Sequence, residues 1–394
     1  MRKPIMLEFP TEEYSNRIAI FIKKMELFDL DAVILTTKEN TRYFSGFRMI
    51  TWDSKISKPG SLIITRDGDV VLVGSYSGLG TMTVTTWVED IRPWDRLGRD
   101  GMITSYPEAI FDVLEKKGLH EGRVGLEIGI GFRMHLTNTD YVRLMELLSK
   151  HVIVDAGPAI WKCRSVKSPL EVERIRKACD INIKSFEKGF KSIYEGMTEL
   201  ELYRVIAMEM MNLGADEIFP LGIRAGADRY SQGNCPPGDR PIGKGEIILV
   251  DGGPGYKGYY SDIIREAIIG QPTRRQKELY DFSVAACLEG LKVIKPGIAA
   301  KEVCKVIDEF VDKNGYGRLY DSRGWAGHSI GLDIHEPPMF EIGSNLILEP
   351  GMVFAIEPSI YEPEVGMFNI EENILITNNG YELLTPLDRN LLVL

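Results

Sequence analysis

The stretch that decides the fold runs from Gly245 to Gly270 and reads "GEIILVDGGPGYKGYYSDIIREAIIG". The segment EIILVD is typical of a buried strand, GGPGYKG has turn chemistry, and YYSDIIREAII predicts a second strand. We therefore expect a β-hairpin that carries Asp251 on one strand and Asp262 on the other, with the two carboxylates face to face. Aspartate is uncommon inside apolar strands, and a buried carboxylate needs a cation or several hydrogen-bond donors.

The hairpin belongs to a weak internal repeat. The segment "EGMTELELYRVIAMEMMNLG" (195–214) resembles "PGIAAKEVCKVIDEFVDKNG" (296–315) at one constant offset. Each copy predicts a helix of about four turns with a glycine at the C-cap, and a β-rich stretch with acidic residues follows. A duplicated unit of this kind predicts two β-sheets back to back around a pseudo-twofold axis. The acidic residues of both copies would then meet at the centre.

Three further stretches follow the second copy: "GHSIGLDIHEPP" (327–338), "GMVFAIEPSIY" (351–361) and "GMFNIEENILIT" (366–377). The first contains two of the five histidines of the chain, His328 and His335. The other two place Glu357 and Glu371 where the core of a strand favours an apolar residue.

A metal centre is the economical explanation of these polar residues. The hard ligand set suits Mn²⁺, Fe²⁺, Co²⁺ or Zn²⁺, and it comprises Asp251, Asp262, His328, Glu357 and Glu371. Four carboxylates would repel one another without about two divalent ions, which bridging carboxylates hold roughly 3.5–4 Å apart. Such a pair lowers the pKa of water, so the expected reaction is hydrolysis of an amide or a similar polar bond. The alternative, that these acids cap turns and pair with Arg265 and other bases, stays open for individual residues.

Composition limits the classes of partner. The chain has 394 residues, of which 44% are hydrophobic and 26% charged, and a net charge of −10, which is typical of a globular protein of two or three domains. The negative charge argues against nucleic acid or an anionic membrane as a partner. The N-terminal stretch carries early charges and Pro4 and Pro10 without an apolar core, so we expect no signal peptide, and no apolar run approaches membrane-spanning length. The five scattered cysteines form no CxxC motif, so we expect reduced thiols and a cytoplasmic location.

The first part of the chain alternates helical and strand patterns. "RIAIFIKKMELFDL" predicts a helix, "DAVILTT" a strand, and Asp67-Gly68 a hairpin turn. Ser168, Pro169 and Glu171 then predict the start of a helix with a capping box. We therefore expect an α+β protein, with an α/β N-terminal domain (1–160) and a pseudo-symmetric second domain (161–394).

These motifs together resemble the pita-bread (M24-type) metallopeptidases. The likeness is closer to Xaa-Pro dipeptidase (prolidase) and aminopeptidase P, because "TTKENTRYFSGF" and "WKCRSVKSPLEVERIRKAC" resemble their creatinase-type N-terminal domain and its junction. The resemblance implies a homodimer and two divalent metal ions (Mn, Co, Fe or Zn) on the five ligands named above. It also implies that His335 contacts the substrate or the tetrahedral intermediate and that Glu357 relays a proton.

Two positions depart from the pattern of that family. Where the Xaa-Pro enzymes usually carry a histidine upstream of the first aspartate, this chain has Gln232-Gly233 or Asn234. Where they often carry an arginine two residues before the last glutamate, it has Asn369, which removes a positive charge suited to carboxylate recognition. Arg224 and Arg229 could replace the lost charges.

The substrate-binding residues that we expect are therefore His335, Gln232, Asn234 and Asn369, and the preferred substrate is an Xaa-Pro peptide. The alternative is a non-peptidase that acts on a small zwitterion or cyclic amide, resembling ectoine hydrolase or dimethylsulfoniopropionate lyase. A catalytically silent binding protein is disfavoured because all five ligands are present.

Overall fold

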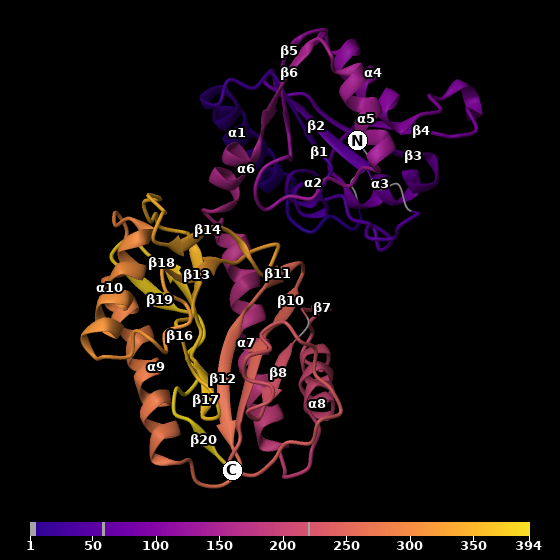
Figure 1. Cartoon of the computed structure of the whole chain (residues 1–394). Coiled ribbons are helices and arrows are strands. Elements are labelled where there is room, and N and C mark those ends of the chain that lie inside the picture. Colours follow the sequence, from indigo (N-terminus) through magenta and orange to yellow (C-terminus); the bar gives the residue numbers. More distant parts are fainter. Residues whose placement is uncertain (1–4, 57–59, 220) are drawn as a thin grey trace. The chain divides into compact units, whose positions relative to one another are not determined.

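The computed structural model describes residues 5–56, 60–219 and 221–394. The chain divides into two compact units, Met1–Arg164 and Ser165–Leu394 (Figure 1). The division thus falls after Arg164, whereas the sequence placed the boundary after residue 160.

The N-terminal unit is built on a mixed sheet of six strands in the order β4-β3-β2-β1-β5-β6. The strands are β1 (Ala32–Leu35), β2 (Gly60–Thr65), β3 (Val70–Ser75), β4 (Asp90–Trp94), β5 (Gly122–Leu126) and β6 (His151–Asp155). β2 and β3 pair antiparallel around the Asp67-Gly68 turn, where Gly68 has a φ of 94°, so the predicted hairpin is confirmed. β5 runs parallel to both β1 and β6, which requires helical crossovers.

In the described part of this unit, six α-helices accompany the sheet: α1 (Thr11–Leu27), α2 (Lys38–Ser45), α3 (Leu79–Thr85), α4 (Tyr106–Lys116), α5 (Asn138–Leu147) and α6 (Gly157–Arg164). Apolar residues of β1, β2 and β5 pack against α4 and α5, as Ile34, Leu114 and Leu144 illustrate; all three are fully buried. The N-terminal unit therefore has a hydrophobic core of its own.

The second unit starts with the helix that the sequence predicted. In α7 (Pro169–Lys191) the Ser168 hydroxyl accepts the Glu171 N–H, and the Glu171 carboxylate accepts the Ser168 N–H. The two copies of the repeat form α8 (Glu199–Asn212) and α10 (Ala300–Lys313). α8 has a capping box at Thr198, whereas the N-cap of α10 is Ala299, which offers no side-chain acceptor. α9 (Arg274–Val293) packs beside α10.

The strands of the second unit form two main sheets. One has the order β20-β12-β9-β8 and the other β14-β13-β15-β18-β19. The first comprises β8 (Gly222–Ala225), β9 (Ile247–Gly252), β12 (Ile263–Ile268) and β20 (Leu392–Val393). The second comprises β13 (Trp325–Ser329), β14 (Glu336–Glu341), β15 (Val353–Ile356), β18 (Glu372–Ile376) and β19 (Tyr381–Leu383).

Short strands border these sheets: β7 (Glu217–Ile218), β10 (Pro254–Tyr256), β11 (Tyr259–Tyr260), β16 (Ser359–Glu362) and β17 (Gly366–Asn369). Figure 1 shows α7 and α8 on one side of the strands and α9 and α10 on the other. Two apolar clusters match these helix layers, one with α8 and the other with α9 and α10. The predicted fold class, an α/β N-terminal domain followed by an α+β domain, is confirmed.

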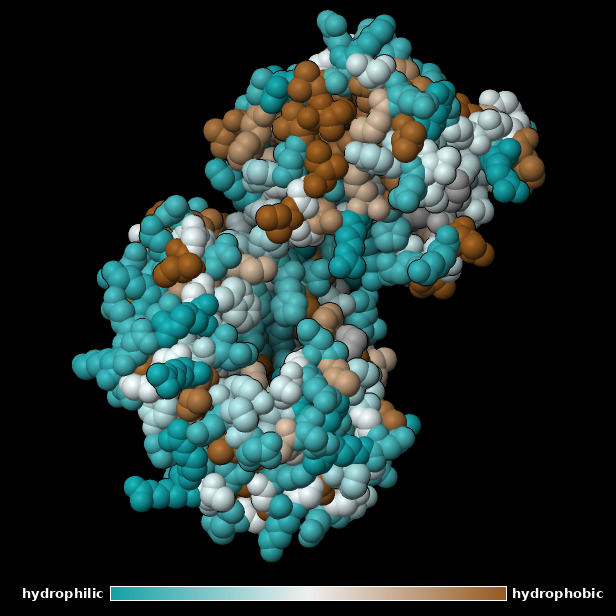
Figure 2. Space-filling view, in the orientation of Figure 1, coloured by the Kyte–Doolittle hydropathy of each residue, from teal (hydrophilic) through white to brown (hydrophobic). Residues whose placement is uncertain are grey.

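The surface of the second unit is mostly hydrophilic on the face shown in Figure 2. Within the described ranges, none of the helices combines the length and the apolar character that crossing a membrane requires.

Candidate metal centre

The Asp251–Asp262 hairpin has the register that places both carboxylates on one face. β9 and β12 are antiparallel, with Asp251 opposite Ile264 and Gly252 opposite Ile263. Asp262 immediately precedes β12 and lies two residues from Ile264, so alternation directs it to the face of Asp251. The two aspartates are therefore diagonal neighbours. A side chain at Gly253 would lie 2.0 Å from the Ser261 carbonyl oxygen, so the close approach of the two strands requires glycine.

His328 comes from the other sheet. It lies on β13, opposite Ala355 of β15, and its Nδ1 lies 3.1 Å from the Ser329 carbonyl oxygen. An N–H at Nδ1 leaves the Nε2 lone pair for the site. Nε2 is 3.1 Å from Glu357 Oε1 and 3.8 Å from Glu371 Oε1. The preceding Gly327 has a φ of 143°, and a Cβ there would lie 2.0 Å from the Ala355 oxygen, which explains the glycine beside this histidine.

Glu357 and Glu371 face each other because of strand pairing. β15 and β18 are antiparallel, and Ile356 at the end of β15 is opposite Glu372 at the start of β18. The next residue outward on each strand is a glutamate, Glu357 or Glu371, so both carboxylates emerge at the same edge. The structure brings the five predicted ligands together: Asp251, Asp262 and Glu371 offer atoms within 4.8 Å of one another, as do His328, Glu357 and Glu371.

Several buried polar atoms of this cluster have no hydrogen-bond partner among the described residues. Among the described residues, no hydrogen bond is made by Asp262 Oδ1, His328 Nε2 or either carboxylate oxygen of Glu371. Burial, followed by repulsion from neighbouring carboxylates, raises the pKa of Asp262 and Glu371 well above the usual range and that of Asp251 to about 7. Buried carboxylates that repel one another and lack donors fit bound cations, and their oxygen and nitrogen atoms fit divalent metals.

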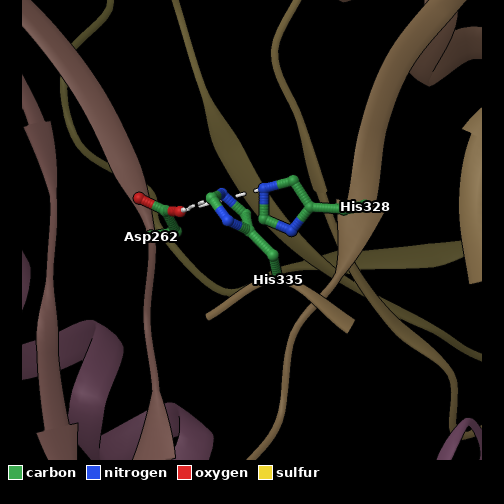
Figure 3. Close-up of side chains that lie close together, drawn as sticks. All are labelled: Asp262, His328 and His335. Carbon is green, nitrogen blue, oxygen red and sulfur yellow. Dashed lines mark ion pairs between the residues drawn. The ribbon is translucent and has the colours of Figure 1, made fainter. Parts of the chain in front are cut away.

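His335 borders the cluster without being buried in it. Figure 3 shows it beside Asp262 and His328; its Nε2 is 3.9 Å from Asp262 Oδ2, and its ring centroid is 4.3 Å from that of His328. The His335 side chain is 57% exposed, whereas His328 is fully buried. Partial removal from water beside the cluster, followed by the nearby His328, lowers the pKa of His335 to about 4, so the imidazole is neutral near neutral pH. A neutral imidazole that an incoming molecule can reach is able to donate one hydrogen bond.

The three other predicted substrate residues differ in their surroundings. Gln232 is exposed, accepts a hydrogen bond from Arg229 and donates one to the Asp228 carbonyl, all within its own loop. Asn234 is exposed in the same loop. Asn369 is buried at the end of β17, and its N–H donates to Glu266 Oε1 over 2.7 Å. Substrate binding by these residues stays a prediction.

Two groups near the site were not predicted from the sequence. The first is Glu266, which is 1% exposed on β12; an acid inside the apolar run of that strand was the available indication. The second is an ion pair between Lys167 and Glu336, whose side chains are each 1% exposed and whose charged atoms are 3.7 Å apart. Nothing in the local sequence joins two charges so far apart in the chain.

Lys167 connects the segments that carry the two histidines. Its Nζ donates to Ser329 Oγ over 2.7 Å, and Ser329 follows His328 directly. Its ion-pair partner Glu336 follows His335, and Glu336 Oε1 also accepts the Asp333 N–H over 3.0 Å. This buried network therefore ties β13 to the turn that presents His335.

Comparison with known proteins identifies the family. Residues 173–378 match the model of metallopeptidase family M24, and residues 17–166 match the creatinase/prolidase N-terminal domain. A protein of Staphylococcus aureus called an uncharacterised peptidase is 29% identical over 375 residues, which cover 95% of this chain and all of that protein.

Solved structures also resemble this chain over nearly its whole length. The prolidase of Pyrococcus horikoshii is 27% identical with a TM-score of 0.81, over 96% of this chain and all of the other. The Xaa-Pro dipeptidase of Bacillus anthracis shares the fold with a TM-score of 0.84 at 24% identity, over 97% of this chain and all of the other. Because the M24 model spans more than half of its residues, the protein belongs to metallopeptidase family M24 and is a metallohydrolase.

Proposed function

We propose that the protein hydrolyses Xaa-Pro peptide bonds with two divalent metal ions. The observation that carries the proposal is the cluster of buried, unpaired carboxylate and imidazole atoms with the reachable His335 at its border. Similarity to proteins named prolidase and Xaa-Pro dipeptidase supports the choice of substrate.

The five clustered side chains would hold the metal ions. Oxygen ligands from four carboxylates and one imidazole nitrogen suit Mn²⁺, which we propose as the native ion. Bound divalent ions supply Lewis acidity, which polarises a carbonyl group and lowers the pKa of water.

Glu357 and His335 have the positions for moving and donating protons. The Glu357 side chain is 15% exposed, whereas that of Glu371 is 1% exposed, so Glu357 is the carboxylate more accessible to a reacting molecule. We infer that Glu357 takes a proton from water as the carbon–oxygen bond forms and gives it to the proline nitrogen as the carbon–nitrogen bond breaks. His335 would donate its N–H to the carbonyl oxygen as negative charge develops there.

Two aromatic rings favour an apolar ring in the substrate. Phe219 lies edge-on to His335 with ring centroids 6.1 Å apart, and Trp325 is stacked against His328 at 6.1 Å. Both aromatic side chains are half-buried. Walls of this kind suit a pyrrolidine ring.

The test is amine release from a panel of Xaa-Pro dipeptides and tripeptides by the Mn²⁺-loaded full chain, with Ala-Ala as a comparison substrate and Asp262→Asn as the control enzyme. We expect turnover of Xaa-Pro bonds that disappears in the control. A folded, Mn²⁺-replete protein without such turnover would rule out the peptidase and favour a small zwitterionic or cyclic amide substrate.

We also propose a homodimer and a cytoplasmic location. The five cysteines are free thiols in the structure, as a reducing compartment requires. Light scattering of the purified chain tests the dimer, and fractionation of cells tests the location.

A further inference from the structure

Two buried arginines of the four-stranded sheet differ in their hydrogen bonds. Arg265 on β12 is 2% exposed and donates five, to Glu372 Oε1 and to four backbone carbonyl groups. Arg224 on β8 is 4% exposed, and in the described part of the chain its buried Nε has no hydrogen-bond partner, while its Nη2 comes only within 3.8 Å of a carboxylate oxygen of Asp251. A guanidinium has five N–H donors, and buried donors are normally paired, so Arg224 requires an explanation.

Strand register places Arg224 beside the metal cluster. Arg224 is opposite Leu249 of β9, and Leu249 is opposite Glu266 of β12, so the three side chains form a row on the face that carries Asp251. Asp251 is opposite Gly222, which has no side chain to separate it from Arg224. Arg224 Nη2 accordingly lies 3.8 Å from Asp251 Oδ2.

Among the described residues, carboxylates lie near the positive charge of Arg224, but they do not accept hydrogen bonds from its N–H groups. Burial raises the pKa of both Asp251 and Glu266, and the charge of Arg224 partly opposes that rise. The 3.8 Å contact with Asp251 is longer than a hydrogen bond, and Asp251 is itself a candidate metal ligand. The planar fork of N–H donors therefore remains available at the edge of the cluster.

We propose that Arg224 is a specificity-determining residue that receives a carboxylate group of the substrate. The guanidinium fork matches a carboxylate in shape and charge. Given the function proposed above, on which this step rests, the group is the C-terminal carboxylate of a dipeptide, which one carbon atom separates from the nitrogen of the scissile bond. Glu266, which shares the row with Arg224 across β9, accepts the Asn369 N–H over 2.7 Å, so Arg224 and Asn369 border the same carboxylate. Arg224 thus supplies the positive charge that Asn369 lacks.

The experiment compares Ala-Pro with Ala-Pro-amide, which lacks the negative charge. Both are hydrolysed by Mn²⁺-loaded wild type, Arg224→Met and the control Arg204→Met, which changes an exposed arginine of α8. We expect Arg224→Met to lower kcat/KM for Ala-Pro by about 10- to 100-fold, mainly through KM, which is the size of a lost charge-assisted interaction. The value for the amide and the Mn²⁺ affinity from calorimetry should not change. Arg224→Lys, which keeps the charge, should recover part of the preference for Ala-Pro and guards against a folding defect in the methionine variant.

An equal loss on both substrates, or weaker Mn²⁺ binding by Arg224→Met, would overturn the inference, because Arg224 would then act only through Asp251. Calorimetric titration with L-proline and prolinamide separates this failure from failure of the proposed function. If wild type cleaves no Xaa-Pro bond yet binds L-proline more tightly than Arg224→Met does, carboxylate binding by Arg224 is supported and the proposed peptidase activity is wrong. If L-proline does not bind, or binds both proteins equally, the inference that Arg224 binds a carboxylate is wrong.

Discussion

Two buried glutamates, one in each unit, have opposite surroundings. Glu127 is 1% exposed, and its carboxylate accepts five hydrogen bonds from Thr36, Thr37 and Asn40. Glu371 is fully buried, and in the described ranges neither of its carboxylate oxygens accepts a hydrogen bond. Burial alone therefore does not separate a structural carboxylate from one that is available to bind a ligand.

Local backbone structure accounts for the contrast. Thr37 is the N-cap of α2 and Asn40 lies in its first turn, so Glu127 accepts donors at the N-terminal end of a helix, where negative charge is stabilised. Glu371 lies at the edge of a strand among Asp251, Asp262 and Glu357, all of which raise its pKa in addition to the larger effect of burial. The free lone pairs of Glu371 cost stability in the absence of a cation and become useful when one binds.

Removing the charge of Glu371 should have the largest effect on activity. We expect Glu371→Gln to weaken Mn²⁺ binding and lower kcat/KM by more than the roughly 10- to 100-fold typical of groups that only support a ligand. Calorimetry with Mn²⁺ and hydrolysis of Ala-Pro measure the two effects. Without metal the variant should be at least as stable as the wild type, because a buried, unpaired carboxylate is lost.

Denaturant unfolding of the metal-free proteins provides the decisive control. If Glu371→Gln binds Mn²⁺ like the wild type, or unfolds at clearly lower denaturant concentration, Glu371 is a structural residue like Glu127 and the comparison fails.

Removing the charge of Glu127 should lower the stability of the protein and leave metal binding unchanged, the reverse of the result expected for Glu371. Glu127→Gln would replace an acceptor by an amide group that cannot satisfy all five donors, at a cost of about 2–4 kcal/mol in the free energy of unfolding. Mn²⁺ affinity should be unchanged. Hydrogen exchange of the amides in β1 and β5 measures the loss where it arises, and a weaker Mn²⁺ affinity in this variant would contradict a purely structural role.

The sequence predicted the contrast only in part. The acids of the metal cluster were recognisable because each interrupts an apolar run, as Asp262 does before Ile263-Ile264. Glu127 also lies within a strand-like run, "RVGLEIG", but its donors are about 90 residues away in the chain, so nothing local shows that it is satisfied. Hydrogen bonds between distant segments depend on tertiary packing, which periodicity and turn chemistry do not report.

Around the site, too, local sequence patterns predict the elements but not the contacts between distant segments. The hairpin, the capping box at Ser168 and the repeat helices follow from local patterns, and all are present. The sequence offered Arg224 and Arg229 equally as replacements for the missing charge. Only the structure separates them, because Arg229 is already paired with Glu199 over 2.9 Å, whereas Arg224 faces Asp251.

Lys167 tests whether a buried charge that already has partners within the protein still matters for catalysis. Because Lys167 ties the segments of His328 and His335 together, we expect Lys167→Met to lower kcat for Ala-Pro by about 10- to 100-fold, as is usual for groups that orient a ligand. In a double-mutant cycle with Glu336→Gln the two losses should be less than additive. Additive losses, or an unchanged kcat in a folded variant, would show that the network serves stability alone.

The effect that we expect to be smallest, taken per pH unit, is a dependence of the metal-free protein's stability on pH. Burial, followed by the charge of Glu357, raises the pKa of Asp251 from 3.8 to about 7. Between these values the folded chain holds a proton that the unfolded chain has lost, so stability should fall as the pH rises from about 4 to 7. The slope is at most about 1.4 kcal/mol per pH unit for one proton, and solvent screening of the one-third exposed side chain reduces it.

Urea unfolding across this range should show the slope in the wild type and a smaller one in Asp251→Asn. Saturating Mn²⁺ should reverse the trend, because metal binding requires deprotonated ligands. Glu127 lies in the other unit and is fully paired, so Glu127→Gln should keep the wild-type slope; if it instead removed the slope, the pH dependence would not come from the metal cluster.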